Sequence, residues 1–183
     1  MLDFVLLTAD QTRPFFGTLV DIYEKAFAQP PFNETFPDFF NFAGRLSYHA
    51  RQPGFRCALA RPAGQAPPVG FVYGYNGQGG SWFYKMAAQH LPPALLNEYL
   101  SDTFEFAELA LLPAWQRQGA GGRLHDLLLD GLPQRTACLM TAEMETHALH
   151  LYLKRGWSTL ARGIELPGTP LRYQMMGKRL AGG

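Results

Sequence analysis

The sequence predicts an α/β or α+β fold, in which a mixed sheet is covered by helices. Segments typical of strands and segments with helical apolar spacing follow one another in the order β-α-α-β-β-(α)-β-α-β-α-β-β. The 19 glycines and 14 prolines favour many short elements joined by frequent turns. A length of 183 residues suits one domain, so we expect a single domain over residues 1–183.

Composition and charge exclude several classes of protein. The chain is 47% hydrophobic with a formal net charge of +1, which argues against intrinsic disorder. Sixteen basic residues against fifteen acidic ones argue against binding to nucleic acid or to an anionic membrane. Cys57 and Cys138 each lie in an apolar run, as expected for reduced cysteines in the cytoplasm. No apolar stretch is long enough to predict a membrane span.

The first quarter of the chain predicts a strand and two helices. Residues 2–8 form the expected opening strand, and Asp10 or Thr12 could cap a helix over 13–28. Apolar residues of that helix recur at spacings of three and four: Phe16, Leu19, Val20, Tyr23 and Phe27. Prolines at 30–31 end this helix, and a second helix is expected over 36–51.

Two strands follow, at 55–61 and 69–75. In the second strand, bulky residues alternate with Gly70, Val72 and Gly74, so the glycine face permits close approach of another segment. The next twenty residues are ambiguous. We expect a strand end near 81–84 and then a helix over 92–101.

The last eighty residues predict an alternation of strands and helices. Strands are expected at 104–112, 136–142, 157–165 and 171–179. Helices are expected at 119–130, with its leucines facing inward, and at 146–155.

A glycine-rich turn joins the strand at 104–112 to the helix that follows it. The turn contains Gln116, Arg117, Gln118, Gly119, Ala120, Gly121 and Gly122. Unpaired amides at a helix N-terminus, the helix dipole and Arg117 together suit a phosphate or pyrophosphate. A P-loop is excluded because Arg123-Leu124 follows the last glycine, and a dinucleotide fingerprint would need glycine at Leu124. From these residues alone, an anion site and a merely tight helix entry remain equal alternatives.

Two motifs in order resemble the GNAT acetyltransferase superfamily. Gln-x-x-Gly-x-Gly at 116–121, after an apolar strand ending in Leu-Pro, resembles motif A of that family. Residues 148–157 (ALHLYLKRGW) resemble motif B, and 172–180 resemble the last strand of many bacterial members. The chain departs from the pattern at Glu145, where members often carry Asn. The resemblance covers residues 104–180 closely, whereas the first hundred residues match only in element order.

The resemblance implies a fold and a cosubstrate. It implies a mostly antiparallel sheet of six to seven strands, flanked by helices, with a splayed parallel strand pair (104–112 and 136–142) that binds acetyl-CoA. Residues 104–180 would form the acetyl-CoA side and 1–103 mainly the acceptor side. Backbone groups of Leu109 and Leu111 would pair with the pantetheine arm. The pyrophosphate would be held by the turn residues: Gln116, Arg117, Gln118, Gly119, Ala120 and Gly121. No metal is expected.

The resemblance also implies N-acetyl transfer to an amine. Tyr152 matches the motif B tyrosine that commonly serves the leaving thiolate. An attacking amine must lose a proton, and two strand carboxylates are candidate bases. We favour Glu105, which shares a strand face with Leu109 and Leu111, and place Glu108 second. A bulge in the strand could change that parity, and a salt-bridged or solvated carboxylate is an equal alternative for either residue.

The acceptor side carries weaker candidates. Phe32, Asn33 and Glu34 lie in the loop between the first two helices, which borders the acceptor site in the family, and Tyr73 could line the cleft. Glu34 and Asp38 could hold a cationic amine. Surface-loop polarity and sheet core are the alternative interpretations. The expected acceptor is a small-molecule or peptide amine, and a homodimer is an open option. The competing functional hypothesis is a catalytically silent acyl-CoA-binding or regulatory module on the same fold.

Overall fold

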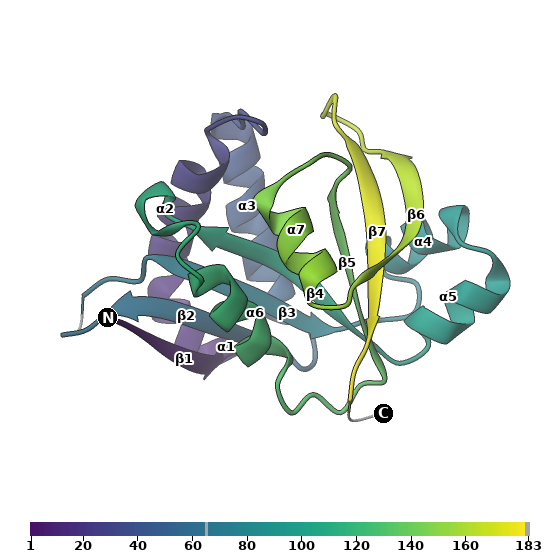
Figure 1. The fold of residues 1–183 in the computed structure, drawn as a ribbon, viewed down its shortest axis with the longest axis horizontal. Coiled ribbons are helices and arrows are strands. Elements are labelled where there is room, and N and C mark those ends of the chain that lie inside the picture. Colours follow the sequence, from purple (N-terminus) through teal and green to yellow (C-terminus); the bar gives the residue numbers. More distant parts are fainter. Residues whose placement is uncertain (65, 182–183) are drawn as a thin grey trace. The chain divides into compact units, whose positions relative to one another are not determined.

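The computed structural model describes residues 1–64 and 66–181, except for the side chains at positions 36, 39 and 40. Seven strands form one sheet in the order β1-β2-β3-β4-β5-β7-β6. The pairs β1–β2, β2–β3, β5–β7 and β6–β7 are antiparallel, and β4–β5 is parallel. The predicted mixed, mostly antiparallel sheet with one parallel pair is therefore confirmed (Figure 1).

The chain divides into two compact units. The first consists of Met1–Tyr75 and Glu108–Asp130, and the second consists of Asn76–Ala107 together with the chain from Gly131 onward. The long strand β4 (Thr103–Leu111) contributes its beginning to the second unit and its end to the first.

The first unit carries strands β1 (Leu2–Thr8), β2 (Arg56–Pro62) and β3 (Gly70–Asn76, through Tyr75). Its helices are α1 (Ala9–Thr12), the short 3₁₀ helix η1 (Arg13–Phe15), α2 (Phe16–Phe27), α3 (Phe36–His49) and α6 (Ala120–Leu129). Helix α6 packs on β1 and β2, and α2 packs against α3 (Figure 1). Leu19, Phe42, Leu46 and Phe71 are fully buried in this unit.

The second unit carries β5 (Thr136–Ala142), β6 (Ser158–Glu165) and β7 (Arg172–Arg179) with helices α4 (Trp82–His90), α5 (Pro93–Leu100) and α7 (His147–Lys154). Helices α4 and α5 bury Phe83, Ala87 and Leu100 against Cys138 and Met175 of the sheet. The free cysteines Cys57 and Cys138 are buried, as the sequence predicted.

Two sequence-based expectations are wrong. The first helix begins at Ala9, not at 13, because Thr8 rather than Asp10 or Thr12 is its N-cap: Thr8 Oγ accepts from the Gln11 amide, and Gln11 bonds back to Thr8. Pro14 then tightens the chain into η1 before α2 continues.

The expected strand end at 81–84 is helical instead. Gly80 adopts φ 80°, which breaks the preceding extended chain, and Ser81 Oγ accepts from the Tyr84 amide at 3.1 Å as an N-cap. Phe83 and Ala87, four residues apart, supply the buried face of α4.

The close approach predicted on the glycine face of β3 is confirmed at Gly70. A Cβ placed on Gly70 would lie 2.7 Å from Cγ of Leu111 and 3.2 Å from the Ala110 carbonyl oxygen. Only glycine therefore fits where β3 passes the end of β4.

Among the residues that the structure describes, no helix combines the length and the hydrophobicity needed to cross a bilayer.

Candidate active site

The glycine-rich turn of the first unit lies between β4 and α6. After Leu111 the chain makes the 3₁₀ turn η2 (Pro113–Trp115), and α6 starts at Ala120. Two residues of the turn have left-handed backbones: Arg117 with φ 60° and Gly119 with φ 84°. A left-handed non-glycine residue costs of the order of 1 kcal/mol, and such strain clusters at functional sites.

Side-chain amides hold the turn from within. Gln116 Nε2 donates to the Leu111 carbonyl at 2.9 Å, and Gln118 Nε2 donates to the Ala114 carbonyl at 2.7 Å. The first backbone bond of α6 runs from the Arg123 amide to the Gly119 carbonyl, so the amides at the helix start precede the intrahelical ladder. The turn is thereby preformed with helix-start amides next to the exposed Arg117.

Gly119 leaves open space in front of this turn. A Cβ at that position would meet nothing within 4 Å. An anion with large oxygens could approach the backbone there, which a side chain would prevent. The residues present therefore fit a phosphate group.

A polar cluster in the same unit is built around Glu108 and Arg45. Arg45 Nη2 of α3 donates to Glu108 Oε2 of β4 at 3.3 Å and to the Tyr23 hydroxyl of α2 at 3.4 Å. Burial raises the pKa of the Glu108 carboxyl to about 7, although the Arg45 guanidinium pulls it downward and Glu34 adds a smaller rise. Glu108 is therefore a carboxyl poised to exchange a proton near neutral pH.

Glu34, in the loop between α2 and α3, extends this cluster. Tyr23 links it to Arg45, because the Tyr23 hydroxyl also hydrogen-bonds Glu34. Burial raises the pKa of Glu34, against that hydrogen bond, and one carboxylate oxygen, Oε2, is buried without a partner among the described residues. A buried oxygen without a donor is unfavourable, so the site lacks a hydrogen-bond donor at this point.

Tyr73 and His49 also belong to the polar cluster. The Tyr73 hydroxyl lies 3.1 Å from Nδ1 of His49, one helical turn after Arg45. Burial lowers the pKa of His49 to about 4, with the Arg45 charge adding to the fall, so the imidazole is neutral at pH 7. Burial likewise raises the pKa of Tyr73, which stays protonated.

Glu105 has a different environment, in the second unit. Its side chain is buried at 4% exposure, and the Ser81 hydroxyl, the N-cap of α4, donates to Oε1 at 3.3 Å. The carboxylate thus ties the beginning of β4 to the start of a helix.

Tyr152 of α7 lies in an aromatic cage of the second unit. Its ring meets Phe106 at 5.7 Å and Trp157 at 5.9 Å between centroids, both edge to face. The side chain is 6% exposed, and this packing fixes the ring.

Comparison with known proteins agrees with this geometry. A family model described as "Acetyltransferase (GNAT) family" matches residues 18–157. The chain belongs to the GNAT acetyltransferase family. The match includes the glycine-rich turn of motif A and reaches the end of motif B at Trp157.

One curated relative of this GNAT protein is a GCN5-like protein acetyltransferase of Mycobacterium tuberculosis. It is 30% identical over 123 residues, and the match covers 63% of this chain and 60% of that relative. The chain thus spans less than two thirds of the relative's length.

Solved structures share the GNAT fold. YncA of Salmonella typhimurium, solved with its cofactor acetyl-CoA, has a TM-score of 0.66 at 14% identity, covering 98% of this chain and 94% of that one. The ribosomal-protein-S18-alanine N-acetyltransferase of Escherichia coli has a TM-score of 0.64 at 16% identity, with the same coverage. At these identities the likeness concerns the fold.

The structure places the sequence-derived site candidates of this GNAT protein in separate groups. Glu34, Tyr73 and Glu108 meet in the polar cluster. Phe32 packs edge to face on Phe27 at 4.9 Å, and Asn33 is exposed with φ 50°. The described pairing of β4 with β5 joins 103–105 to 136–138, at the beginning of both strands.

Sequence reasoning missed three members of the cluster: Tyr23, Arg45 and His49. Spacing on α3 carried a signal, because Arg45 and His49 are four residues apart and follow Phe42 by three and seven. A polar pair on the buried stripe of a helix is a feature that sequence inspection can find.

Helix α7 carries two histidines, His147 and His150, three residues apart. His150 Nε2 bonds Glu145 Oε2 at 2.8 Å, whereas the Glu143 carboxylate accepts from the Gly163 amide at 2.7 Å. Within the described part of the chain, no group of three or more ligating side chains could hold a metal ion.

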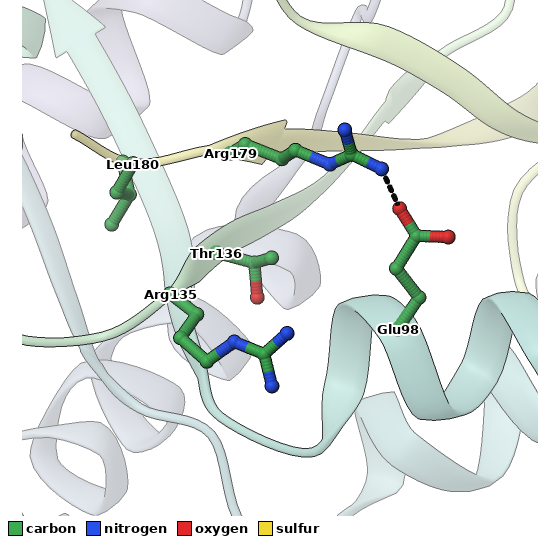
Figure 2. Close-up of a pocket in the computed structure, with 5 residues that line it drawn as sticks. All are labelled: Glu98, Arg135, Thr136, Arg179 and Leu180. Carbon is green, nitrogen blue, oxygen red and sulfur yellow. Dashed lines mark hydrogen bonds and ion pairs between the residues drawn. The ribbon is translucent and has the colours of Figure 1, made fainter. Parts of the chain in front are cut away.

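A pocket of about 240 Å³ in the second unit lies where α5, β5 and β7 meet (Figure 2). Its lining consists of Glu98, Arg135, Thr136, Arg179 and Leu180. Arg179 is ion-paired with Glu98, and the Thr136 hydroxyl donates to the Tyr99 and Asp102 carbonyls. Most of its polar groups therefore already have partners, and we assign no ligand to this pocket.

Proposed function

We propose that the protein is an acetyl-CoA-dependent N-acetyltransferase that transfers an acetyl group to a primary amine of a small molecule or peptide. Family membership supports the reaction class. The observation that carries the proposal within this chain is the preformed turn at 116–121, with its left-handed Gly119 and open helix-start amides. Such a turn suits the pyrophosphate of CoA.

The proposed cosubstrate site lies along β4 and the turn. Acetyl-CoA supplies the acetyl group as a thioester. The turn residues hold its pyrophosphate: Gln116, Arg117, Gln118, Gly119, Ala120 and Gly121. Because the Leu111 carbonyl already accepts from Gln116, the pantetheine arm would pair with the Leu111 amide and with backbone groups of Leu109.

The proposed chemistry is direct attack of the amine on the thioester. An alkyl ammonium must first lose a proton, and a carboxylate with a pKa near the working pH suits that step. Glu108, with its pKa raised to about 7 by burial, is the better proposed base, and Glu105 is the alternative. The Glu108 carboxylate takes the proton from the ammonium group, and the amine nitrogen then bonds to the carbonyl carbon of the thioester.

Collapse of the tetrahedral intermediate breaks the carbon–sulfur bond and releases the CoA thiolate. A backbone amide near Leu109 would stabilise the oxyanion. Tyr152 would donate a proton or a hydrogen bond to the thiolate. Its caged ring supports this role, because packing holds the hydroxyl in one direction.

The proposed acceptor carries a protonated amine. Glu34 offers a buried oxygen without a donor, and an ammonium N–H would satisfy it. Tyr73 is fully buried, so the partly exposed rings of Phe27 and Phe32 would contact the apolar part of the acceptor. Phe32 and Asn33 belong to the same loop as Glu34.

A free-thiol assay tests the function. Purified protein is incubated with acetyl-CoA and a panel of polyamines, aminoglycosides, amino acids and peptides. CoA release with at least one amine, abolished by leaving the amine out, supports the proposal. Calorimetric binding of acetyl-CoA without turnover on the whole panel would instead favour a silent acyl-CoA-binding module. Absence of both binding and turnover would overturn the proposal.

Paired variants then separate the two carboxylates. Glu108→Gln is expected to lower kcat by roughly 10²-fold or more with CoA affinity unchanged. Glu105→Gln is expected to act mainly on stability, because it alters a buried bond with Ser81. The reverse pattern would assign the base to Glu105.

A further inference from the structure

Arg45 is a cation of α3 whose described side-chain contacts belong to the polar cluster. Its Nη2 atom reaches Glu108 at 3.3 Å and Tyr23 at 3.4 Å, and it also hydrogen-bonds the Tyr73 hydroxyl. Its side chain is 41% exposed, compared with 15% for Glu108. Arg45 is thus the more exposed partner of this ion pair.

An aromatic platform fixes the guanidinium. Tyr23 and Phe42 stack with ring centroids 3.8 Å apart and planes 3° from parallel. The Arg45 Cζ atom lies 5.8 Å from the Tyr23 centroid and 5.4 Å from the Phe42 centroid. Two cation–π contacts with this stacked pair add to the ion pair with Glu108 in restraining the guanidinium.

We propose that Arg45 is a positioning residue, which holds the Glu108 carboxylate in one orientation and supplies the counter-charge that lets it ionise at neutral pH. Tyr23 extends the arrangement by joining Arg45 to Glu34. This inference rests on the proposed role of Glu108 as base, but the state of the Glu108 carboxyl can be measured without any reaction.

The charged and titratable groups that face Glu108 determine whether loss of Arg45 raises or lowers the pKa of this carboxyl. Burial and the Glu34 carboxylate raise the pKa of Glu108, whereas Arg45 and the Leu109 amide lower it. His49 is neutral and Tyr73 stays protonated, so neither replaces the charge of Arg45. Asp38 adds negative charge beside Glu34. Loss of Arg45 therefore removes the cation that faces Glu108 and raises the pKa of this carboxyl above about 7.

NMR of the glutamate carboxyl carbons measures the titration midpoint of Glu108 directly. The full chain is labelled with ¹³C at glutamate side-chain carboxyls, and the Glu108 signal is assigned by its loss in Glu108→Gln. The wild-type signal should titrate near neutral pH. Arg45→Gln should move the titration midpoint to a pH higher by about 1–2, and Arg45→Lys should move it by less, because lysine keeps the charge but loses the planar fork.

Two further variants test whether a change in the Glu108 titration midpoint is specific to Arg45. Arg51→Gln is the matched control, since Arg51 follows the same helix and donates to the Ser47 carbonyl instead. Tyr23→Phe keeps the stacked platform but removes the link to Glu34, so it should change the Glu108 midpoint less than Arg45→Gln does. Far-UV and near-UV circular dichroism confirm that each variant is folded before it is titrated.

The pH profile of kcat/KM gives the catalytic readout. The acidic limb should move to higher pH in Arg45→Gln, so that activity at a fixed pH on that limb falls roughly 10–100-fold and recovers to a plateau at high pH. An equal drop at all pH values, with the acidic limb at its wild-type pH, would contradict the proposed counter-charge role of Arg45. So would equal Glu108 midpoints in Arg45→Gln and Arg51→Gln. If the wild type shows no turnover, the proposed function fails, while the NMR titration still decides the role of Arg45.

Discussion

The hydroxyl of Tyr73 on β3 and Nδ1 of His49 on α3 lie 3.1 Å apart, where the Tyr73 side chain is fully buried and His49 is half-buried. The two rings are also in contact, with centroids 5.8 Å apart, and Tyr75 lies 4.6 Å from the imidazole. The imidazole thus packs against two aromatic rings of the strand. Its burial, with the Arg45 charge adding to the effect, keeps it neutral at pH 7.

This burial predicts a stability change with pH. Burial lowers the folded-state pKa of His49 to about 4, below an unfolded value of about 6.5. The unfolded chain therefore takes up a proton first, and stability is lost as pH falls from about 6.5 towards about 4, by up to about 3 kcal/mol. Urea unfolding at several pH values gives the free energy of unfolding as a function of pH. This free energy should fall less steeply with falling pH in His49→Gln than in wild type. An equal pH dependence of the free energy of unfolding in the two proteins would contradict the lowered pKa of His49.

Gly119→Ala should weaken the turn before α6. Alanine at φ 84° is strained by of the order of 1 kcal/mol, and its methyl group enters the open space in front of the amides. We expect roughly tenfold weaker CoA binding by calorimetry. Gly17→Ala, at an exposed position of α2, is the control, which should gain about 0.5–1 kcal/mol in stability and bind CoA normally. Unchanged affinity in Gly119→Ala would remove the turn from the cosubstrate site.

Tyr152→Phe should lower turnover without disturbing the fold. Phenylalanine keeps the edge-to-face contacts with Phe106 and Trp157, so only the hydroxyl is lost. Loss of a general acid predicts a kcat lower by roughly 10²-fold, with CoA affinity unchanged. Tyr48→Phe, on a side chain 58% exposed, should keep the wild-type rate. Full activity in Tyr152→Phe would mean that another group serves the leaving thiolate.

Gly177→Ala should destabilise the second unit. A Cβ on Gly177 of β7 would lie 2.5 Å from Cδ1 of Tyr99 and 2.8 Å from Cδ1 of Leu160. Such overpacking costs about 1–3 kcal/mol. Tyr99→Leu in the same chain should restore part of the loss, measured as a coupling energy in a double-mutant cycle of unfolding. Gly79→Ala, with nothing within 4 Å of its Cβ, should show no such coupling with Tyr99→Leu.

Local sequence signals predicted most elements of the fold. The strand at 136–142 is found at Thr136–Ala142, and the helix expected over 92–101 is found at Pro93–Leu100. Errors arose where a single capping side chain decided the structure. Ser81 turns the ambiguous stretch after it into α4, and Thr8 starts a helix four residues earlier than periodicity indicated. Periodicity measures which face is buried, whereas a cap determines where the first turn begins.

The amino-acid sequence by itself determined the family and the place of the glycine-rich turn, because both depend on residues close together in the chain. Only the tertiary structure decided how the two candidate carboxylates differ. Glu108 meets Arg45, 63 positions earlier, whereas Glu105 meets Ser81. Three residues apart on one strand, they receive opposite surroundings, since side chains along a strand alternate between its two faces and each face packs against different segments. Burial and counter-charge set the proton affinity of a carboxyl, and both come from residues distant in sequence.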